Sequence, residues 1–226
     1  LKLKPEFYFL KEDHLESDLN KSTLNFSHDY SLDDLPFPNW EKMSKNFKNT
    51  SLLFGIYPTV PILATRGCPY SCFKYCVYPL QQGRKVRQRN VKLIVDEMKY
   101  NYDKGVKMFV FRDPVFSINR KHTIDFCNEV ISRNLNIRFI IETHLRILDT
   151  ELIILLKKAG LKAVKVGVES SDPDVLKSAG RFTIKKDEQL EKIRELEKNN
   201  IEISAMFILG FPTDNEKSMD NTIDYA

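Results

Sequence analysis

Three of the chain's four cysteines lie within nine residues of the stretch TRGCPYSCFKYCVYP, which covers residues 65–79. They are Cys68, Cys72 and Cys76. Three thiolates on one short loop can converge on a single metal centre, and Gly67 and Pro69 suit a tight bend at the entrance of the loop. A structural zinc site normally takes four protein ligands, whereas a [4Fe-4S] cluster held by three cysteines leaves one iron open to an outside ligand. The stretch therefore predicts a reactive metal centre with the rest of the chain as its scaffold.

Composition limits the class of protein. The 226 residues are enough for one sizeable domain, and a hydrophobic content of 42% is ordinary for a chain with a buried core. No apolar run approaches the ~20 residues that span a bilayer, so we expect no membrane span. Three clustered cysteines and a separate fourth, without a secretory leader, argue against a disulfide framework and predict a cytoplasmic protein. The net charge of +4, from 35 basic and 31 acidic residues, is too balanced to indicate nucleic-acid binding by itself.

From residue 61 onward, short apolar runs alternate with longer amphipathic stretches, which is the pattern of repeated βα units around a parallel sheet. We expect strands at Pro61–Thr65, Val106–Phe111, Ile137–Ile141, Ala163–Val168 and Ile203–Leu209. We expect helices at Val91–Tyr102, within Ile118–Arg133, at Thr150–Ala159, at Lys185–Asn199 and from near Asn215. Because each helix must cover the same outer face, right-handed crossovers would curl the sheet into part of a barrel.

Reactive groups in barrels built from βα units gather at the C-terminal ends of the strands. In this chain every expected strand ends in polar or glycine-containing sequence. These ends are the cysteine loop, Arg112-Asp113-Pro114, Glu142-Thr143-His144, Glu169-Ser170-Ser171 and Gly210-Phe211-Pro212-Thr213. We therefore expect one rim of the barrel to carry the functional residues. A plain turn at Asp113 and a helix cap at Ser170 are the structural alternatives for those two ends.

The cysteine stretch resembles the radical S-adenosylmethionine (SAM) enzymes, and especially the branch found downstream of a cobalamin-binding domain. The resemblance rests on Arg66–Cys72 and Tyr75–Pro79, and it extends from about residue 33 to the end of the chain. The family pattern is Cys-x3-Cys-x2-Cys, whereas this chain has three residues in the second gap as well. The resemblance implies a partial (β/α)6 barrel, which this chain would follow through its fifth strand and helix, without a sixth strand.

The resemblance also implies cofactors and a reaction. Cys68, Cys72 and Cys76 would hold a [4Fe-4S] cluster whose free iron binds SAM, and reductive cleavage of SAM would give a 5′-deoxyadenosyl radical. The implied SAM-binding positions are Tyr75 and Gly210 near adenine, Glu169 and Ser170 near the ribose, and Asp113 and Arg181 near the methionine end. The implied partners are a small-molecule substrate and an electron donor such as flavodoxin or ferredoxin. The substrate and any catalytic residue are not implied.

Residues 1–58 are expected to form an irregular N-terminal arm, and residues 59–226 the barrel. The arm lacks a long periodic pattern, and its Leu35–Trp40 segment has two prolines flanking an aromatic ring, which favours extended backbone pinned by burial of Trp40. This segment is similar to the linker that joins a cobalamin domain to the radical domain. Cobalamin, bound by a domain upstream of this chain, is implied by that similarity alone, together with methyl transfer or a ring-forming rearrangement.

Other interpretations fit the same residues. The basic run Arg84–Lys92 would suit a solvated loop and helix start, or a radical SAM enzyme without cobalamin that modifies RNA. The three loop cysteines with His144 or His122 would make a zinc-binding module. The extra residue between Cys72 and Cys76 would suit a pseudoenzyme that has lost its cluster. Cys127 is expected to be an apolar filler within a helix, outside any of these sites.

Overall fold

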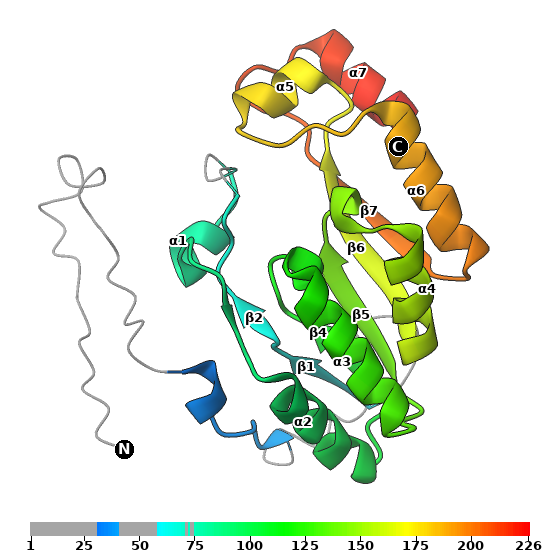
Figure 1. The fold of residues 1–226 in the computed structure, drawn as a ribbon. Helices are drawn as coiled ribbons and strands as arrows, with labels where there is room; N and C mark the ends of the chain where they lie inside the picture. The colour runs from blue at the N-terminus through cyan, green and yellow to red at the C-terminus, as the bar shows by residue number, and fades with distance from the viewer. Residues whose placement is uncertain (1–30, 41–57, 71, 73–74) are drawn as a thin grey trace, which may run out of the picture.

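A five-stranded parallel sheet forms the centre of the structure (Figure 1). The computed structural model describes residues 31–40, 58–70, 72 and 75–226. The strands lie in the order β1-β4-β5-β6-β7, and all four neighbouring pairs are parallel. Their bounds are β1 Thr59–Ile62, β4 Met108–Phe111, β5 Arg138–Thr143, β6 Leu161–Glu169 and β7 Glu202–Phe207. The expected α/β architecture, a partial barrel of five parallel strands, is confirmed.

Helices that connect these strands cover one face of the sheet (Figure 1). They are α2 Val91–Asp103, α3 Arg120–Ser132, α4 Thr150–Ala159 and α6 Lys186–Lys198, while α7 Glu216–Tyr225 follows the last strand. Four of these five helices begin where an Asn or Asp side chain accepts a backbone N–H of the first turn, at Asn90, Asn119, Asp149 and Asn215. Such caps satisfy donors that have no partner within the helix, which is why the expected helix starts agree with the structure to within a few residues.

The main core lies between the sheet and these helices. Four phenylalanine rings on β4, β5, α3 and the turn before α3 pack together with centroids 4.5 to 6.5 Å apart. They are Phe111, Phe116, Phe126 and Phe139. A smaller apolar cluster consists of Met108, Val110, Ile140 and Ala163, which alternate with the core residues along their strands. Because successive strand residues point to opposite faces, this second cluster marks the face that the helices leave uncovered.

The first strand differs from its expected position. We predicted Pro61–Thr65, but β1 is Thr59–Ile62, and Thr65–Arg66 forms a separate strand, β2, antiparallel to β3 at Arg87–Gln88. The prediction was wrong because the backbone N–H groups of Ala64 and Thr65 donate to the carboxylate of Asp113 and so leave the main sheet. Pro61 is tolerated because β1 is an edge strand.

Two short helices were not expected. α1 at Tyr78–Gln82 follows the cysteine loop directly, and α5 at Pro173–Ser178 follows β6. Both carry a proline in the first turn, where its missing N–H costs nothing. These helices and the β2–β3 ribbon are the parts that surround the C-terminal ends of the strands.

The described part of the N-terminal arm, residues 31–40, lies against α2. Leu32 is buried, the Asp33 carboxylate accepts the backbone N–H of Asn90 at 2.6 Å, and the ring of Phe37 lies 6.2 Å from that of Tyr100. Trp40 is half-buried and packs against the main core, as expected of the pinning residue. The rest of the predicted arm, residues 1–30 and 41–57, lies outside the described residues.

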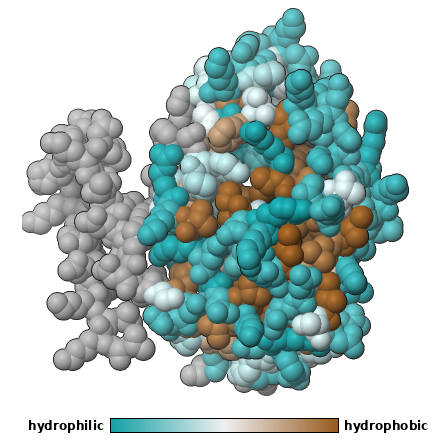
Figure 2. Space-filling view, viewed as in Figure 1, coloured by the Kyte–Doolittle hydropathy of each residue, from teal (hydrophilic) through white to brown (hydrophobic). Residues whose placement is uncertain are grey.

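The outer face of the helical layer is mostly hydrophilic, with hydrophobic residues exposed in patches between charged side chains (Figure 2). Among the helices that the structure describes, none is both long and apolar enough to cross a membrane.

Candidate functional site

A pocket lies at the C-terminal ends of β4, β5, β6 and β7, against the cysteine loop. Six of the nine predicted site residues line it: Cys68, Cys72, Tyr75, Cys76, Glu169 and Arg181. The other lining residues are Tyr70, Tyr78, Pro114, Val115, Glu142, Thr143, His144, Gly167 and Met206. The rim expected from the strand ends therefore exists, and it gathers residues that are more than 100 positions apart in the chain.

The cysteine loop is held at both ends by backbone contacts. At its entrance Gly67 has φ +95°, and a β-carbon there would lie 2.1 Å from the carbonyl oxygen of Lys85, so only glycine fits. The N–H of Cys68 donates to Gly83 O at 3.0 Å. At its exit the N–H of Cys76 donates to Cys72 O at 2.9 Å. This bond holds the backbone at Cys76 close to that at Cys72 although the second gap has three residues.

The three loop cysteines are free thiols in a mostly enclosed position. Cys68 and Cys72 are buried and Cys76 is half-buried. Burial raises the pKa of the Cys68 and Cys76 thiols, so they stay protonated near neutral pH unless a metal centre replaces the protons. Cys127 is also free, but it lies in the core on α3, as expected.

Glu169 enters the pocket from a distorted strand end. The pairing of β6 with β7 shifts register between Gly167 and Glu169, and Glu169 has φ +69°. A bulge of this kind turns a side chain away from the ordinary strand alternation. The Glu169 carboxylate then lies over Gly167, where a β-carbon would come within 2.1 Å of Oε1.

Arg181 fixes this carboxylate. Its Nη2 donates to Gly167 O at 2.5 Å and lies 3.7 Å from Glu169 Oε1. Burial raises the pKa of Glu169, while the Arg181 guanidinium opposes that rise. The pair therefore presents one anionic and one cationic group to the same pocket as the cysteines.

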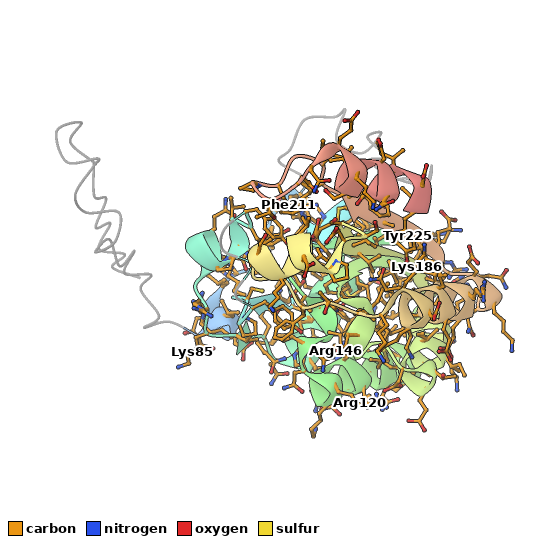
Figure 3. The ribbon with its side chains drawn as sticks, turned by 90° about the horizontal axis from the view of Figure 1, so that it is seen from above. Lys85, Arg120, Arg146, Lys186, Phe211 and Tyr225 are labelled. Carbon is orange, nitrogen blue, oxygen red and sulfur yellow. The ribbon has the colours of Figure 1, made fainter. Side chains whose placement is uncertain are left out.

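Aromatic rings form two walls of the pocket. Tyr70 lies between His144 and Phe182, with ring centroids 5.9 and 5.4 Å away. Tyr75 meets Phe211 edge to face at 5.3 Å, and Phe211 packs between the cysteine loop and α5 (Figure 3). Sequence reasoning assigned no role to the rings of Tyr70 and Tyr78, because an aromatic side chain without periodic context carries no site signal. Phe211 lies in one of the expected strand ends, Gly210-Phe211-Pro212-Thr213.

Three predicted site residues do not line the pocket. Asp113 has no exposed surface, and its oxygens accept the N–H groups of Ala64 and Thr65. Ser170 is buried and lies 3.2 Å from the Thr222 hydroxyl of α7. Gly210, with φ +90°, donates its N–H to the Asp214 carboxylate at 3.0 Å. All three stabilise segments behind the pocket. Asp113 holds the start of the cysteine loop, Ser170 joins the segment before α5 to α7, and Gly210 holds the turn that carries Phe211.

The two histidines predicted as a fourth zinc ligand are both engaged by the backbone. His122 on α3 lies 2.8 Å from the backbone carbonyl of Arg89 through Nε2, and it is not a pocket residue. His144 lines the pocket, but its Nδ1 accepts the N–H of Arg146, and burial lowers its pKa to about 4. Within the described residues, no group of three or more His, Cys, Asp or Glu side chains is arranged to hold a single metal ion. A cluster of several irons does not require thiolates that meet at one ion.

The arginines of the basic run donate hydrogen bonds to backbone carbonyls around the cysteine loop, although Arg84, Lys85 and Lys92 are exposed. Arg84 donates to Pro69 O, Arg87 to Gln82 O at 3.2 Å, and Arg89 to Leu63 O at 2.9 Å. Each of these bonds ties the β2–β3 ribbon or its flanks to the segments around the cysteine loop. Nothing in this arrangement favours an RNA backbone over a structural role for the run.

Comparison with known proteins agrees with this geometry. The sequence profile described as "Radical SAM superfamily" matches residues 62–226, which include the cysteine loop and all strands of the sheet except the start of β1. The chain belongs to the radical SAM superfamily. Membership implies a [4Fe-4S] cluster and SAM as cofactors, and it makes the chain an enzyme rather than a zinc-binding module.

The curated relatives include a methyltransferase and a cyclase. Bacteriochlorophyllide d C-12(1)-methyltransferase of Chlorobaculum tepidum is 31% identical over 170 residues, which are 74% of this chain and 37% of that protein. Anaerobic magnesium-protoporphyrin IX monomethyl ester cyclase of Cereibacter sphaeroides is 32% identical over 195 residues, 84% of this chain and 31% of that one. The chain thus spans less than half the length of these relatives.

Solved structures confirm the fold of this radical SAM chain. The methyltransferase TsrM from Kitasatospora setae, with cobalamin and a [4Fe-4S] cluster bound, superimposes with a TM-score of 0.68 at 22% identity. The match covers 74% of this chain and 31% of TsrM. At 22% identity the structural similarity supports the partial-barrel fold, and it gives no information on the reaction.

Proposed function

We propose that this radical SAM chain cleaves SAM reductively at a [4Fe-4S] cluster held by Cys68, Cys72 and Cys76. The radical formed in this way would take part in a cobalamin-dependent reaction on a small molecule. One observation carries the proposal. The three free thiols face the same pocket as the Glu169–Arg181 pair, at the strand ends where βα barrels carry their chemistry. The pocket therefore combines soft metal donors with a pair of charged groups suited to an amino-acid-like cofactor.

The residues present fit both cofactors. Three free cysteines, two of them buried and one half-buried, are the donor set of an iron–sulfur cluster with one open position. The hydroxyl of Tyr75 is buried beside the Glu169 carboxylate and opposes the rise in the pKa of that group, so the two polar side chains are placed to meet one ligand in the pocket. We assign Glu169 to the ribose hydroxyls, Arg181 to the methionine carboxylate and the Tyr75 segment to adenine. We assign supporting roles to Asp113, Ser170 and Gly210, because their polar groups are engaged behind the pocket.

When bound, the cluster and SAM would supply a 5′-deoxyadenosyl radical through one-electron cleavage of the sulfonium bond. The protein's part is to bind and orient. Arg181 offers a fixed guanidinium whose other contact is Gly167 O, so a carboxylate approaching it meets a preorganised donor. The rings of Tyr70 and Tyr75, which line the pocket, would shield a carbon radical there from water and so from side reactions.

Relatives guide the rest of the proposal. The bacteriochlorophyllide methyltransferase and the magnesium-protoporphyrin cyclase act on tetrapyrroles by name, and TsrM holds cobalamin together with its cluster. We propose that this chain works beside a cobalamin domain outside residues 1–226, with residues 31–40 as part of the linker. A flavodoxin or ferredoxin would supply the electron. The four free cysteines suit the reducing cytoplasm.

Anaerobic reconstitution with iron and sulfide tests the function. We expect about four irons and four sulfides per chain, broad visible absorption, and release of 5′-deoxyadenosine and methionine when SAM and dithionite are added. Metal analysis, the absorption spectrum and chromatography of the products measure these. A colourless chain that takes up zinc alone would contradict the proposal.

Replacing Gly167 with alanine tests the role of Glu169. The new β-carbon would lie 2.1 Å from Glu169 Oε1 and 3.0 Å from Arg181 Nη2, so the pair must move out of its position. We expect SAM affinity to fall at least about tenfold, a loss of about 1.4 kcal/mol, with iron content unchanged. Equilibrium dialysis of labelled SAM with the reconstituted chain measures this.

The matched control is Gly105→Ala. A β-carbon at Gly105 meets no atom within 4 Å, although its φ of +93° makes alanine strained there, so this variant tests whether a strained glycine substitution far from the pocket weakens binding. SAM affinity should be unchanged in this variant. Equal losses in both variants would mean that general destabilisation, rather than displacement of Glu169, weakens binding.

A further inference from the structure

A second cavity lies between the N-terminal arm and the edge of the sheet, and it shares no residue with the cysteine pocket. Its volume is about 230 Å³. One wall is apolar and comes from the arm and from β1 and the residue that follows it: Leu35, Pro36, Pro38, Trp40, Pro61, Ile62 and Leu63. The opposite wall carries Arg66, Arg89, Glu97 and Arg112. The proposed function uses none of these residues.

The charges of this cavity do not cancel. Arg89 is buried and its Nη1 forms an ion pair with Glu97 Oε2 at 2.6 Å, so these two neutralise each other. Neither Arg66 nor Arg112 forms an ion pair with a described residue. Arg112 lies near enough to the Glu142 carboxylate to oppose the rise in that group's pKa, so Arg66 is the guanidinium left without an opposing charge. A guanidinium stays charged at any physiological pH.

Hydrogen-bond donors in the cavity wall also lack acceptors. The Nε groups of Arg66 and Arg89 are buried, and neither has a hydrogen-bond partner. A buried donor without an acceptor costs about 1–3 kcal/mol. Such groups are rare in native proteins, and a bound ligand that accepts the hydrogen bond is one explanation for them. An anion in the cavity would accept these N–H groups and balance the excess charge at the same time.

We propose that this cavity binds a small organic anion, with its carboxylate or phosphate group against Arg66 and Arg112 and its apolar body against Trp40 and the arm prolines. The planar fork of arginine matches the oxygens of both anions. Trp40 offers a broad apolar surface that is only half exposed. Because the arm, β1 and the β2 strand that leads to Cys68 all line the cavity, the ligand joins the arm to the base of the cysteine loop.

The single tryptophan of the chain gives a direct readout, because Trp40 lines the cavity. The full 226-residue chain is titrated with benzoate, phenyl phosphate and the uncharged benzamide at constant ionic strength, and Trp40 fluorescence is followed. We expect saturable changes with the anions and none with benzamide. Binding should weaken about tenfold or more in Arg66→Gln and Arg112→Gln, since each removes one charge-assisted contact.

Arg138→Gln is the matched control, because Arg138 is an exposed arginine at the opposite end of the sheet. It should bind both anions like the unaltered chain. Tighter binding of one anion than of the other, with the same dependence on Arg66 and Arg112, supports the site and identifies its head group. The inference is overturned if no anion gives saturation, if benzamide binds equally well, or if all arginine variants behave alike. Should Arg66→Gln fail to fold, Arg112→Gln alone decides, because Arg112 is exposed.

Discussion

Replacement of Cys76 with alanine is expected to abolish assembly of the iron–sulfur cluster, and the same holds for Cys68 and Cys72. The three thiols line one pocket, and a [4Fe-4S] cluster with only two protein thiolates has a second open iron and is lost readily. We expect iron and sulfide to fall from about four per chain to near zero after reconstitution and desalting. Iron and sulfide analysis with the visible spectrum measures the loss, and SAM cleavage should disappear with it.

Cys127→Ala controls for removal of a thiol as such. Cys127 is buried on α3 and does not line the pocket, so the variant should keep its iron although it loses some stability. If Cys127→Ala lost the cluster as completely as Cys76→Ala, general unfolding would explain both results. If the unaltered chain held no iron but deletion of one residue between Cys72 and Cys76 restored it, the longer spacing would be the defect, and the pseudoenzyme interpretation would hold.

The parts of the fold that sequence predicted are those with a repeating pattern. The β4, β5, β6 and β7 strands and their helices lie within a few residues of their expected positions, because apolar runs of four to nine residues alternate with amphipathic helices. The C-terminal ends of the strands in parallel βα units lie at one edge of the sheet. The location of the pocket could therefore be predicted from the alternation of strands and helices along the sequence. Glu169 stands in an expected strand end, but the choice of Glu169 and Ser170 as the residues near the ribose needed the family resemblance.

The parts that sequence could not predict depend on single long-range contacts. The two-residue strands β2 and β3 are too short to show any periodicity. The residue before β2, Ala64, donates its N–H to the Asp113 carboxylate, 49 residues further along the chain. Asp113 itself stands at a strand end like a functional residue, yet its carboxylate turns inward. A polar residue after a strand is equally compatible with a ligand contact and with a backbone contact, and only the path of the Ala64–Thr65 segment decides between them.

Replacement of Asp113 with alanine is expected to lower the free energy of unfolding by about 3–5 kcal/mol. The carboxylate is fully buried and accepts the backbone N–H groups of Ala64 and Thr65, which lead into the cysteine loop. Alanine would leave two buried donors without acceptors at about 1–3 kcal/mol each and would also leave a small cavity. Asp113→Asn should cost less, because its amide oxygen can still accept. Chemical denaturation followed by circular dichroism measures the difference.

The control and the pH dependence distinguish this account from a general effect of losing a carboxylate. Asp125→Ala removes a half-exposed partner of Lys121 and should cost under about 0.5 kcal/mol. Burial raises the pKa of Asp113 to about 7, from an ordinary value of 3.8. The folded state therefore holds this proton more tightly than the unfolded chain, so the contribution of Asp113 to stability is greatest below pH 4 and is lost as the pH rises through 7. Relative to Asp113→Asn, the unaltered chain should become less stable over that range by a few kcal/mol. If the difference in unfolding free energy between the two chains stayed constant from about pH 4 to 7, the Asp113 carboxylate would be ionised throughout. The N–H groups that donate to it would then lower its pKa by more than burial raises it.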